Sequence, residues 1–207
     1  MKQHFHKADW EFLQETALVG AKKATLSLSR LLKKPVHVQV TQTKILNIEE
    51  ILSLLGGRES LVAVVYFDVH GSFSADALFV FPMKVALQLA DFLLGRKTGT
   101  TKILDEFAQS ALKELGNISS ASYLTAFSEI LEGRLIHSVP ALAVDMLQAV
   151  LDGVLIPKAE KMGNVIVLDT LFEIEKIKIP GHFLFLPDPE GIEKIFRVTL
   201  RGGDNDA

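Results

Sequence analysis

The chain has 207 residues, of which 48% are hydrophobic and 23% are charged, a composition typical of a folded globular protein rather than a disordered tail or a coiled coil. Its 22 basic and 25 acidic residues give a net charge of −3, which argues against nucleic-acid binding through a basic face. The absence of Cys excludes disulfides, thiolate catalysis and Cys-ligated metals, and it fits a reducing cytosol.

The beginning of the chain carries no apolar run of the kind that a signal peptide needs. Prolines or charged residues also interrupt the longest apolar stretches before they reach the roughly 18 residues of a membrane-spanning helix. The sequence therefore predicts a cytoplasmic protein that binds neither membrane nor nucleic acid.

The first half predicts a long helix followed by strands. Apolar residues recur every three or four positions through residues 10–32, which predicts a helix with these core positions: Leu13, Ala17, Ala21, Ala24, Leu28 and Leu31. The other predicted elements of this half are a strand at 36–40 after Pro35, a short apolar segment at 47–55 ending at Gly56-Gly57, a strand at 61–69, a hairpin turn at His70-Gly71, a strand ending at Phe81, and a helix at 83–94 opened by Pro82.

The second half predicts a similar order. Its elements are a helix at 105–131, a strand at 135–139, an apolar helix at 141–151 after Pro140, strands at 164–177 and 182–187 separated by a Pro180-Gly181 turn, and a helix at 190–198.

The two halves align when the first is shifted by 99 positions, which places Glu15 on Glu114 and Ser29 on Ser128. We interpret residues 1–207 as a single domain made of two helix–strand–helix–hairpin–helix repeats, at about 10–95 and 105–200. The predicted fold class is α+β, with long helices packed on a mostly antiparallel sheet and a pseudo-twofold repeat.

Three polar residues form one stripe on the second long helix. At about 100° per residue, Ser110, Glu114 and Asn117 fall within a sector about 60° wide. The adjacent sector is expected to face the core and contains Phe107, Ala111, Leu115 and Ile118. A Glu and an Asn at this spacing also occur on ordinary solvated helix faces, so the stripe alone leaves both interpretations open.

Gly116 is unusual inside a helix, where Gly costs roughly 0.5–1 kcal/mol relative to Ala. One interpretation is that the backbone of a binding partner approaches closely there. The other is that Gly116-Asn117 ends one helix, with Ser119 or Ser120 capping the next.

The spacing Ser110-x3-Glu114-x2-Asn117, followed after 22 residues by Pro140, resembles the signature of the CheC/CheX/FliY family of chemotaxis phosphatases. The resemblance continues through three segments: Leu104–Phe107, Glu114–Ile118 and Val144–Met146. The length and the two-copy organisation are also similar to those of CheC.

This resemblance implies a substrate, namely the aspartyl phosphate of a CheY-like response regulator. It implies that Asn117 orients the attacking water and that Glu114 pairs with the regulator's active-site lysine, while Ser110 and Pro140 support the site. No cofactor is expected on this chain, because the Mg²⁺ belongs to the regulator.

The first half departs from the family pattern. The positions that correspond to the motif are Glu11, Glu15 and Leu18, with Thr41 in place of the proline. Leu18 cannot orient water, so we interpret the first half as a retained fold with a degenerate site. An ordinary amphipathic helix explains Leu18 equally well.

The sequence offers few other candidates for a metal site or a charged binding site. His4 and His6 could meet a metal or belong to a frayed terminus, and the remaining His residues have no ligand spacing. The lysines at 22, 23, 33 and 34 are most simply solvated charges. Two functions remain: a phosphatase with one intact site, and an adaptor that binds a response regulator or a CheD-like deamidase with little turnover.

Overall fold

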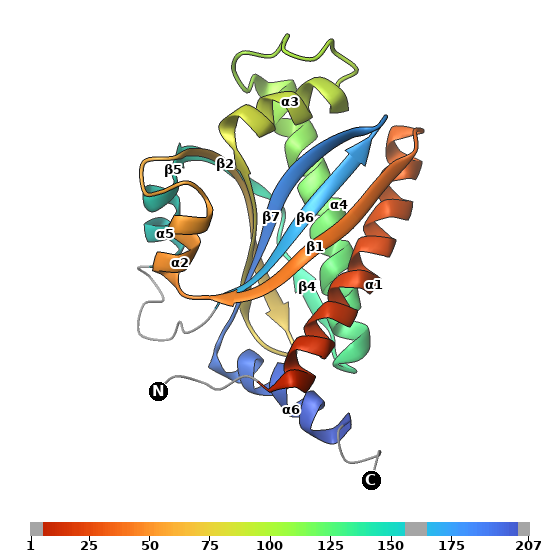
Figure 1. The fold of residues 1–207 in the computed structure, drawn as a ribbon, viewed down its shortest axis with the longest axis vertical. Helices are drawn as coiled ribbons and strands as arrows, with labels where there is room; N and C mark the ends of the chain where they lie inside the picture. Colours follow the sequence, from red (N-terminus) through yellow and green to blue (C-terminus); the bar gives the residue numbers. More distant parts are fainter. Residues whose placement is uncertain (1–5, 156–164, 203–207) are drawn as a thin grey trace.

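The computed structural model describes residues 6–155 and 165–202 (Figure 1). Within these residues, seven strands form one antiparallel sheet in the order β1-β6-β7-β3-β2-β4, and β5 also pairs with β2. The predicted α+β class, with helices on a mostly antiparallel sheet, is therefore confirmed.

The elements of the two halves follow one another in a similar order. The first half contains α1 (Lys7–Leu32), β1 (Val36–Leu46), α2 (Ile48–Leu54), β2 (Leu61–Gly71), β3 (Ala75–Pro82) and α3 (Met83–Leu93). The second half contains α4 (Glu106–Ile130), β4 (Leu135–His137), β5 (Ala141–Met146), α5 (Leu147–Leu155), β6 (Val165–Ile174), β7 (Ile177–Pro187) and α6 (Pro189–Gly202).

The sheet interleaves the two halves. β1 pairs with β6 of the second half, and β5 pairs with β2 of the first half. The hairpins β2–β3 and β6–β7 meet along the β3–β7 pairing at the centre of the sheet. The first half thus adds β1 to the hairpin of the second half, and the second half adds β4 and β5 to the hairpin of the first half.

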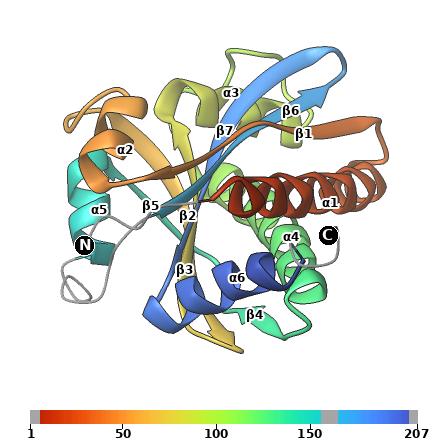
Figure 2. The same ribbon diagram turned by 60° about the horizontal axis from the view of Figure 1, so that its bottom comes forward.

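The two long helices lie side by side on one face of the sheet, as Figures 1 and 2 show. They cover the larger core, in which the rings of Phe79, Tyr123 and Phe183 are fully buried. A smaller core lies on the opposite face, under α2 and α5. The helices α1 and α4 are therefore held by the sheet on one side and leave their outer faces to solvent.

Matching contacts recur 99 residues apart at the ends of α1 and α4. The Ser29 hydroxyl accepts a hydrogen bond from the Val36 N–H at 3.0 Å, and the Ser128 hydroxyl accepts one from the Leu135 N–H at 3.0 Å. Lys33 and its counterpart Glu132 both adopt the left-handed conformation, with φ of 51° and 48°. These matches place Leu18 of α1 at the helix position that Asn117 holds in α4.

A network of hydrogen bonds fixes the start of α4. The Asp105 carboxylate caps the helix by accepting the Ala108 N–H at 2.8 Å, and it also pairs with Arg96 at 3.1 Å. Asp91, buried at the end of α3, accepts the backbone N–H groups of Gly99, Thr100 and Thr101. The connection between the two halves is thereby tied down just before the helix that carries the polar stripe.

The predicted helix at 141–151 is wrong in its first half. Residues Ala141–Met146 form β5, which pairs with Leu61–Tyr66 of β2, and α5 begins only at Leu147. Periodicity cannot separate a strand from a helix in a short apolar run, and here the free edge of β2 selects the strand.

The predicted turn at Pro180-Gly181 is also wrong, because both residues lie inside β7. The chain reverses instead at Glu175 and Lys176, which have φ of 51° and 70°. Gly181 is explained by packing, since a Cβ there would lie 2.5 Å from Cε1 of Phe81.

Smaller differences concern element ends. β2 continues through His70-Gly71, where it pairs with β4, so the first hairpin turns at residues 72–74. β1 extends to Leu46, β4 ends at His137, and residue 164 lies outside the described residues. Five of the six predicted core positions of α1 are buried, but Leu31 is 47% exposed.

Candidate functional site

The helix that carries the polar stripe is continuous. α4 runs from Glu106 to Ile130 without a break at Gly116-Asn117, so the interpretation of this pair as a helix end is wrong. Ser119 and Ser120 are buried inside the helix and do not cap a second one. The continuous backbone sets the spacing of Ser110, Glu114 and Asn117.

Gly116 allows α4 to approach the sheet. A Cβ at this position would lie 2.9 Å from Cγ1 and 3.0 Å from Cβ of Val65 in β2. The close neighbour is thus a side chain of the protein's own core, and the interpretation of Gly116 as a contact point for a partner's backbone is wrong. Because Asn117 follows Gly116 directly, this packing also fixes where Asn117 lies relative to the sheet.

The stripe grades from exposed to half-buried along the helix. Ser110 and Glu114 are exposed, and Asn117 is half-buried. Among the residues that the structure describes, Glu114 forms no ion pair. The carboxylate of Glu114 can pair with a cation of a binding partner. The half-buried amide of Asn117, on the same face, can orient a small polar molecule.

Asn117 borders an open groove of about 480 Å³ between α1 and α4. Lys23 of α1 and His137 of β4 line the same groove. Lys23 forms an ion pair with Glu129 of α4 at 2.8 Å, so it links the two long helices rather than being a simple solvated charge. His137 lies with Nδ1 2.9 Å from the Ser138 carbonyl oxygen, and its ring packs edge-on against Phe67.

No pattern in the sequence indicates that Lys23 or His137 belongs to this site. Lys23 is about one hundred positions from Asn117, and His137 belongs to a three-residue strand. The packing of α1 and of β4 against α4 brings them together.

Pro140 lies on the connection between β4 and β5 and is half-buried. Both strands contact α4, so this connection runs beside the helix. Within the described part of the chain, however, Pro140 is not one of the residues that line the Asn117 groove.

The first-half counterparts occupy the outer face of α1. Glu11 forms an ion pair with Lys7 at 3.3 Å, and Glu15 is exposed. Leu18 is 55% exposed and borders a separate groove of about 540 Å³ between α1 and β1, which Thr41 also lines. The equivalent stripe is therefore accessible, but it presents an apolar side chain where α4 presents an amide.

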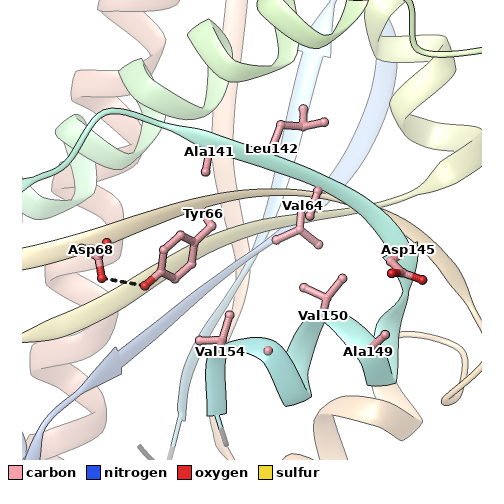
Figure 3. Close-up of a pocket in the computed structure, with 11 residues that line it drawn as sticks. Val64, Tyr66, Asp68, Ala141, Leu142, Asp145, Ala149, Val150 and Val154 are labelled. Atoms are coloured by element: carbon pink, nitrogen blue, oxygen red, sulfur yellow. Dashed lines mark hydrogen bonds between the residues drawn. The ribbon is translucent and has the colours of Figure 1, made fainter. Parts of the chain in front are cut away.

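A third cavity, of about 530 Å³, opens between β2, β5 and α5 (Figure 3). Apolar side chains form most of its wall, with Tyr66 and Asp68 at one end and Asp145 at the other. Burial, together with hydrogen bonds to Asp68 and Asp76, raises the pKa of Tyr66 well above its usual value. The phenol therefore stays protonated at neutral pH, and no member of the polar stripe lines this cavity.

The described residues hold no group of three or more His, Asp or Glu side chains that could bind a metal ion. His4 lies outside the described residues, so the suggested His4–His6 pair has no structural test. No helix in the described part of the chain is both long and apolar enough to cross a membrane.

Comparisons with known proteins identify the family of this chain. The model of the CheC-like family matches residues 107–144, which contain the polar stripe and Pro140. The chain is 30% identical over 190 residues to the CheY-P phosphatase CheC of Bacillus subtilis (strain 168), covering 90% of this chain and 91% of that protein. The chain therefore belongs to the CheC-like family.

Solved structures share the fold. Thermotoga maritima FliY superposes with a TM-score of 0.73 at 20% identity, over 96% of this chain and 99% of that chain. A chain of the H. pylori FliM–SpeE complex superposes with a TM-score of 0.71 at 13% identity, over 99% of this chain and 100% of that chain. The family resemblance expected from the motif is thus confirmed.

Proposed function

We propose that the protein is a cytoplasmic phosphatase that hydrolyses the aspartyl phosphate of a CheY-like response regulator, with its working site on α4. The observation that carries the proposal is the projection of Glu114 and Asn117 from one face of a continuous helix, with Asn117 anchored by the packing of Gly116 on Val65. The name of the Bacillus subtilis relative, a CheY-P phosphatase, supports the same substrate.

In this proposal, Asn117 positions the attacking water. Its amide both donates and accepts hydrogen bonds, so it can hold a water in line with the phosphorus–oxygen bond that breaks. The water oxygen bonds to phosphorus, the regulator's aspartate leaves as a carboxylate, and inorganic phosphate is released. A carboxylate at position 117 would instead place negative charge beside the phosphoryl group.

Glu114 serves as the docking group. Its exposed carboxylate would pair with the regulator's active-site lysine and bring the amide three residues later to the phosphoryl group. The charge of the phosphoryl group is neutralised by Mg²⁺ held on the regulator, so this chain needs no cofactor of its own. Ser110 and Pro140 act as supporting residues at the edge of the site.

The first half carries no working site in this proposal. Leu18 holds the position of Asn117 but offers no hydrogen-bonding group, although Glu15 remains on the same face. The protein therefore works with one site.

A second candidate function is supported by that degenerate stripe and by the likeness to the FliM fold. In this alternative, the chain is an adaptor that docks a regulator, or a CheD-like deamidase, and turns over little. Fold likeness alone does not carry an activity, so the adaptor ranks second.

Turnover distinguishes the two candidates. Phosphorylated CheY of Bacillus subtilis serves as the probe, and loss of its phosphoryl group is followed with the protein at one hundredth of the CheY concentration. A phosphatase shortens the half-life of the whole pool. An adaptor that merely binds leaves the half-life unchanged at this ratio, and this result would remove the enzymatic proposal.

A further inference from the structure

Large apolar side chains close in sequence to the motif residues Ser110 and Pro140 are exposed. Phe107, three residues before Ser110, is 73% exposed, although the sequence pattern placed it toward the core. Ile103, four residues before Phe107, is 74% exposed, and Val139, directly before Pro140, is 86% exposed. Exposed apolar residues that flank a polar site are typical of a surface that is covered when a partner binds.

Phe107 and Glu114 lie on nearly the same line along α4. Seven residues at about 100° each bring the two side chains within about 20° of one another, about 10.5 Å apart along the axis. A partner that contacts Glu114 therefore also faces Phe107. No other element of the described chain covers this side chain.

We infer that Phe107 and Val139 form an apolar rim that docks the phosphorylated receiver domain and sets which regulators the protein accepts. This inference rests on the proposed function, and the occupant is the CheY-like receiver itself. The receiver is chosen as the occupant because the rim residues are next in sequence to both parts of the motif that it must reach. Phe107 precedes Ser110 and Glu114 on α4, and Val139 precedes Pro140.

The rim residues and the polar residues make different contributions, because their side chains differ in chemistry. Phe107 and Val139 carry no polar side-chain atom, so they cannot orient water or pair with a lysine, and their contribution is burial of apolar surface on docking. Glu114 and Asn117 supply the polar contacts at the phosphoryl group. The rim therefore acts on the affinity for the regulator, whereas Asn117 acts on the chemical step.

The test measures KM and kcat separately for Phe107→Ala and Val139→Ala, with phosphorylated Bacillus subtilis CheY as substrate. Each variant is expected to raise KM, by about tenfold for Phe107→Ala, while kcat stays within about twofold of the wild-type value. The control is Leu61→Ala, which truncates another exposed apolar residue at the start of β2, outside the rim. Circular dichroism checks that every variant is folded.

Calorimetric binding to beryllofluoride-loaded CheY gives a readout that does not need turnover. The affinity should fall for both rim variants and stay unchanged for Leu61→Ala. Wild-type turnover combined with unchanged KM and affinity in the rim variants would overturn this inference alone. Binding that depends on the rim without any wild-type turnover would instead overturn the phosphatase proposal and keep the rim.

Discussion

Gly116 of α4 lies against Val65 of β2 so closely that a methyl group on the glycine would come within 2.9 Å of the valine Cγ1. The helix therefore contacts the sheet at the residue that precedes Asn117. The position of the proposed water-orienting amide depends on a glycine that the chemistry itself does not use.

Gly116→Ala should destabilise the protein and reduce phosphatase activity, because the added methyl group must push α4 away from β2. Overpacking of this kind costs about 1–3 kcal/mol. The control is Gly153→Ala in α5, where a Cβ would meet no atom within 4 Å and Ala improves helix propensity. Urea denaturation of both variants checks the difference, and equal stability of the two would mean that α4 does not depend on this contact.

Glu114→Gln should weaken binding to the beryllofluoride-loaded regulator, because the neutral amide cannot form the proposed ion pair with the receiver's lysine. We expect a loss of about three- to tenfold in affinity, which shrinks as salt is raised. Glu15→Gln, the counterpart on α1, should leave the affinity unchanged. Titration calorimetry at two salt concentrations measures both, and equal affinities for wild type and Glu114→Gln would exclude the ion pair.

Leu18→Asn should be tolerated, because the side chain is already 55% exposed on α1. The expected cost is below about 1 kcal/mol, whereas emptying a buried position such as Leu28 by Leu28→Ala should cost about 2–5 kcal/mol. Thermal melts of the two variants compare them directly. A large loss of stability in Leu18→Asn would show that Leu18 belongs to the core and does not occupy an accessible counterpart of the Asn117 position.

The ionised carboxylate of Asp91 should make the free energy of unfolding depend on pH in the acid range. Burial alone would raise the pKa of this carboxyl group, but hydrogen bonds from Thr101, Gly99 and Thr100 outweigh it and lower the pKa. A lowered folded-state pKa means that the stabilisation is fully present above the unfolded value of about 3.9 and is lost as the pH falls through the folded-state pKa.

The measurement is the free energy of unfolding of wild type and Asp91→Asn from pH 7 down to pH 3. The variant should be less stable at pH 7, because the neutral amide offers one acceptor oxygen in place of two. The difference in the free energy of unfolding between wild type and Asp91→Asn should become smaller toward pH 3. A gap that stays constant over this range would show that the charge of Asp91 does not contribute.

The sequence could predict those parts of the structure whose signals are local. The apolar period of α1 and the stripe spacing on α4 both follow from residues close together in the chain, and the structure has these elements where they were expected. Similarity of the motif to the CheC family also predicted the family correctly.

What the sequence missed depends on contacts between distant residues. Ala141–Met146 became a strand because the edge of β2 was free to pair, and Gly181 fits inside β7 because Phe81 lies against it. Phe107 lies on the line of the exposed Glu114 along α4, outside the face that buries Ala108 and Leu112. The residues that share the groove with Asn117 come from α1 and β4, which only tertiary packing brings together.

The most direct test of the proposed mechanism is the half-life of the phosphoryl group on the regulator in the presence of Asn117→Ala. The control is Leu18→Ala, which truncates the matching position on α1, and circular dichroism verifies that both variants are folded. The mechanism predicts that Asn117→Ala loses at least about tenfold in rate, close to the regulator's own rate, because water is no longer positioned, whereas Leu18→Ala keeps the wild-type rate. A folded Asn117→Ala variant that still shortens the half-life as wild type does would contradict the claim that Asn117 orients the attacking water.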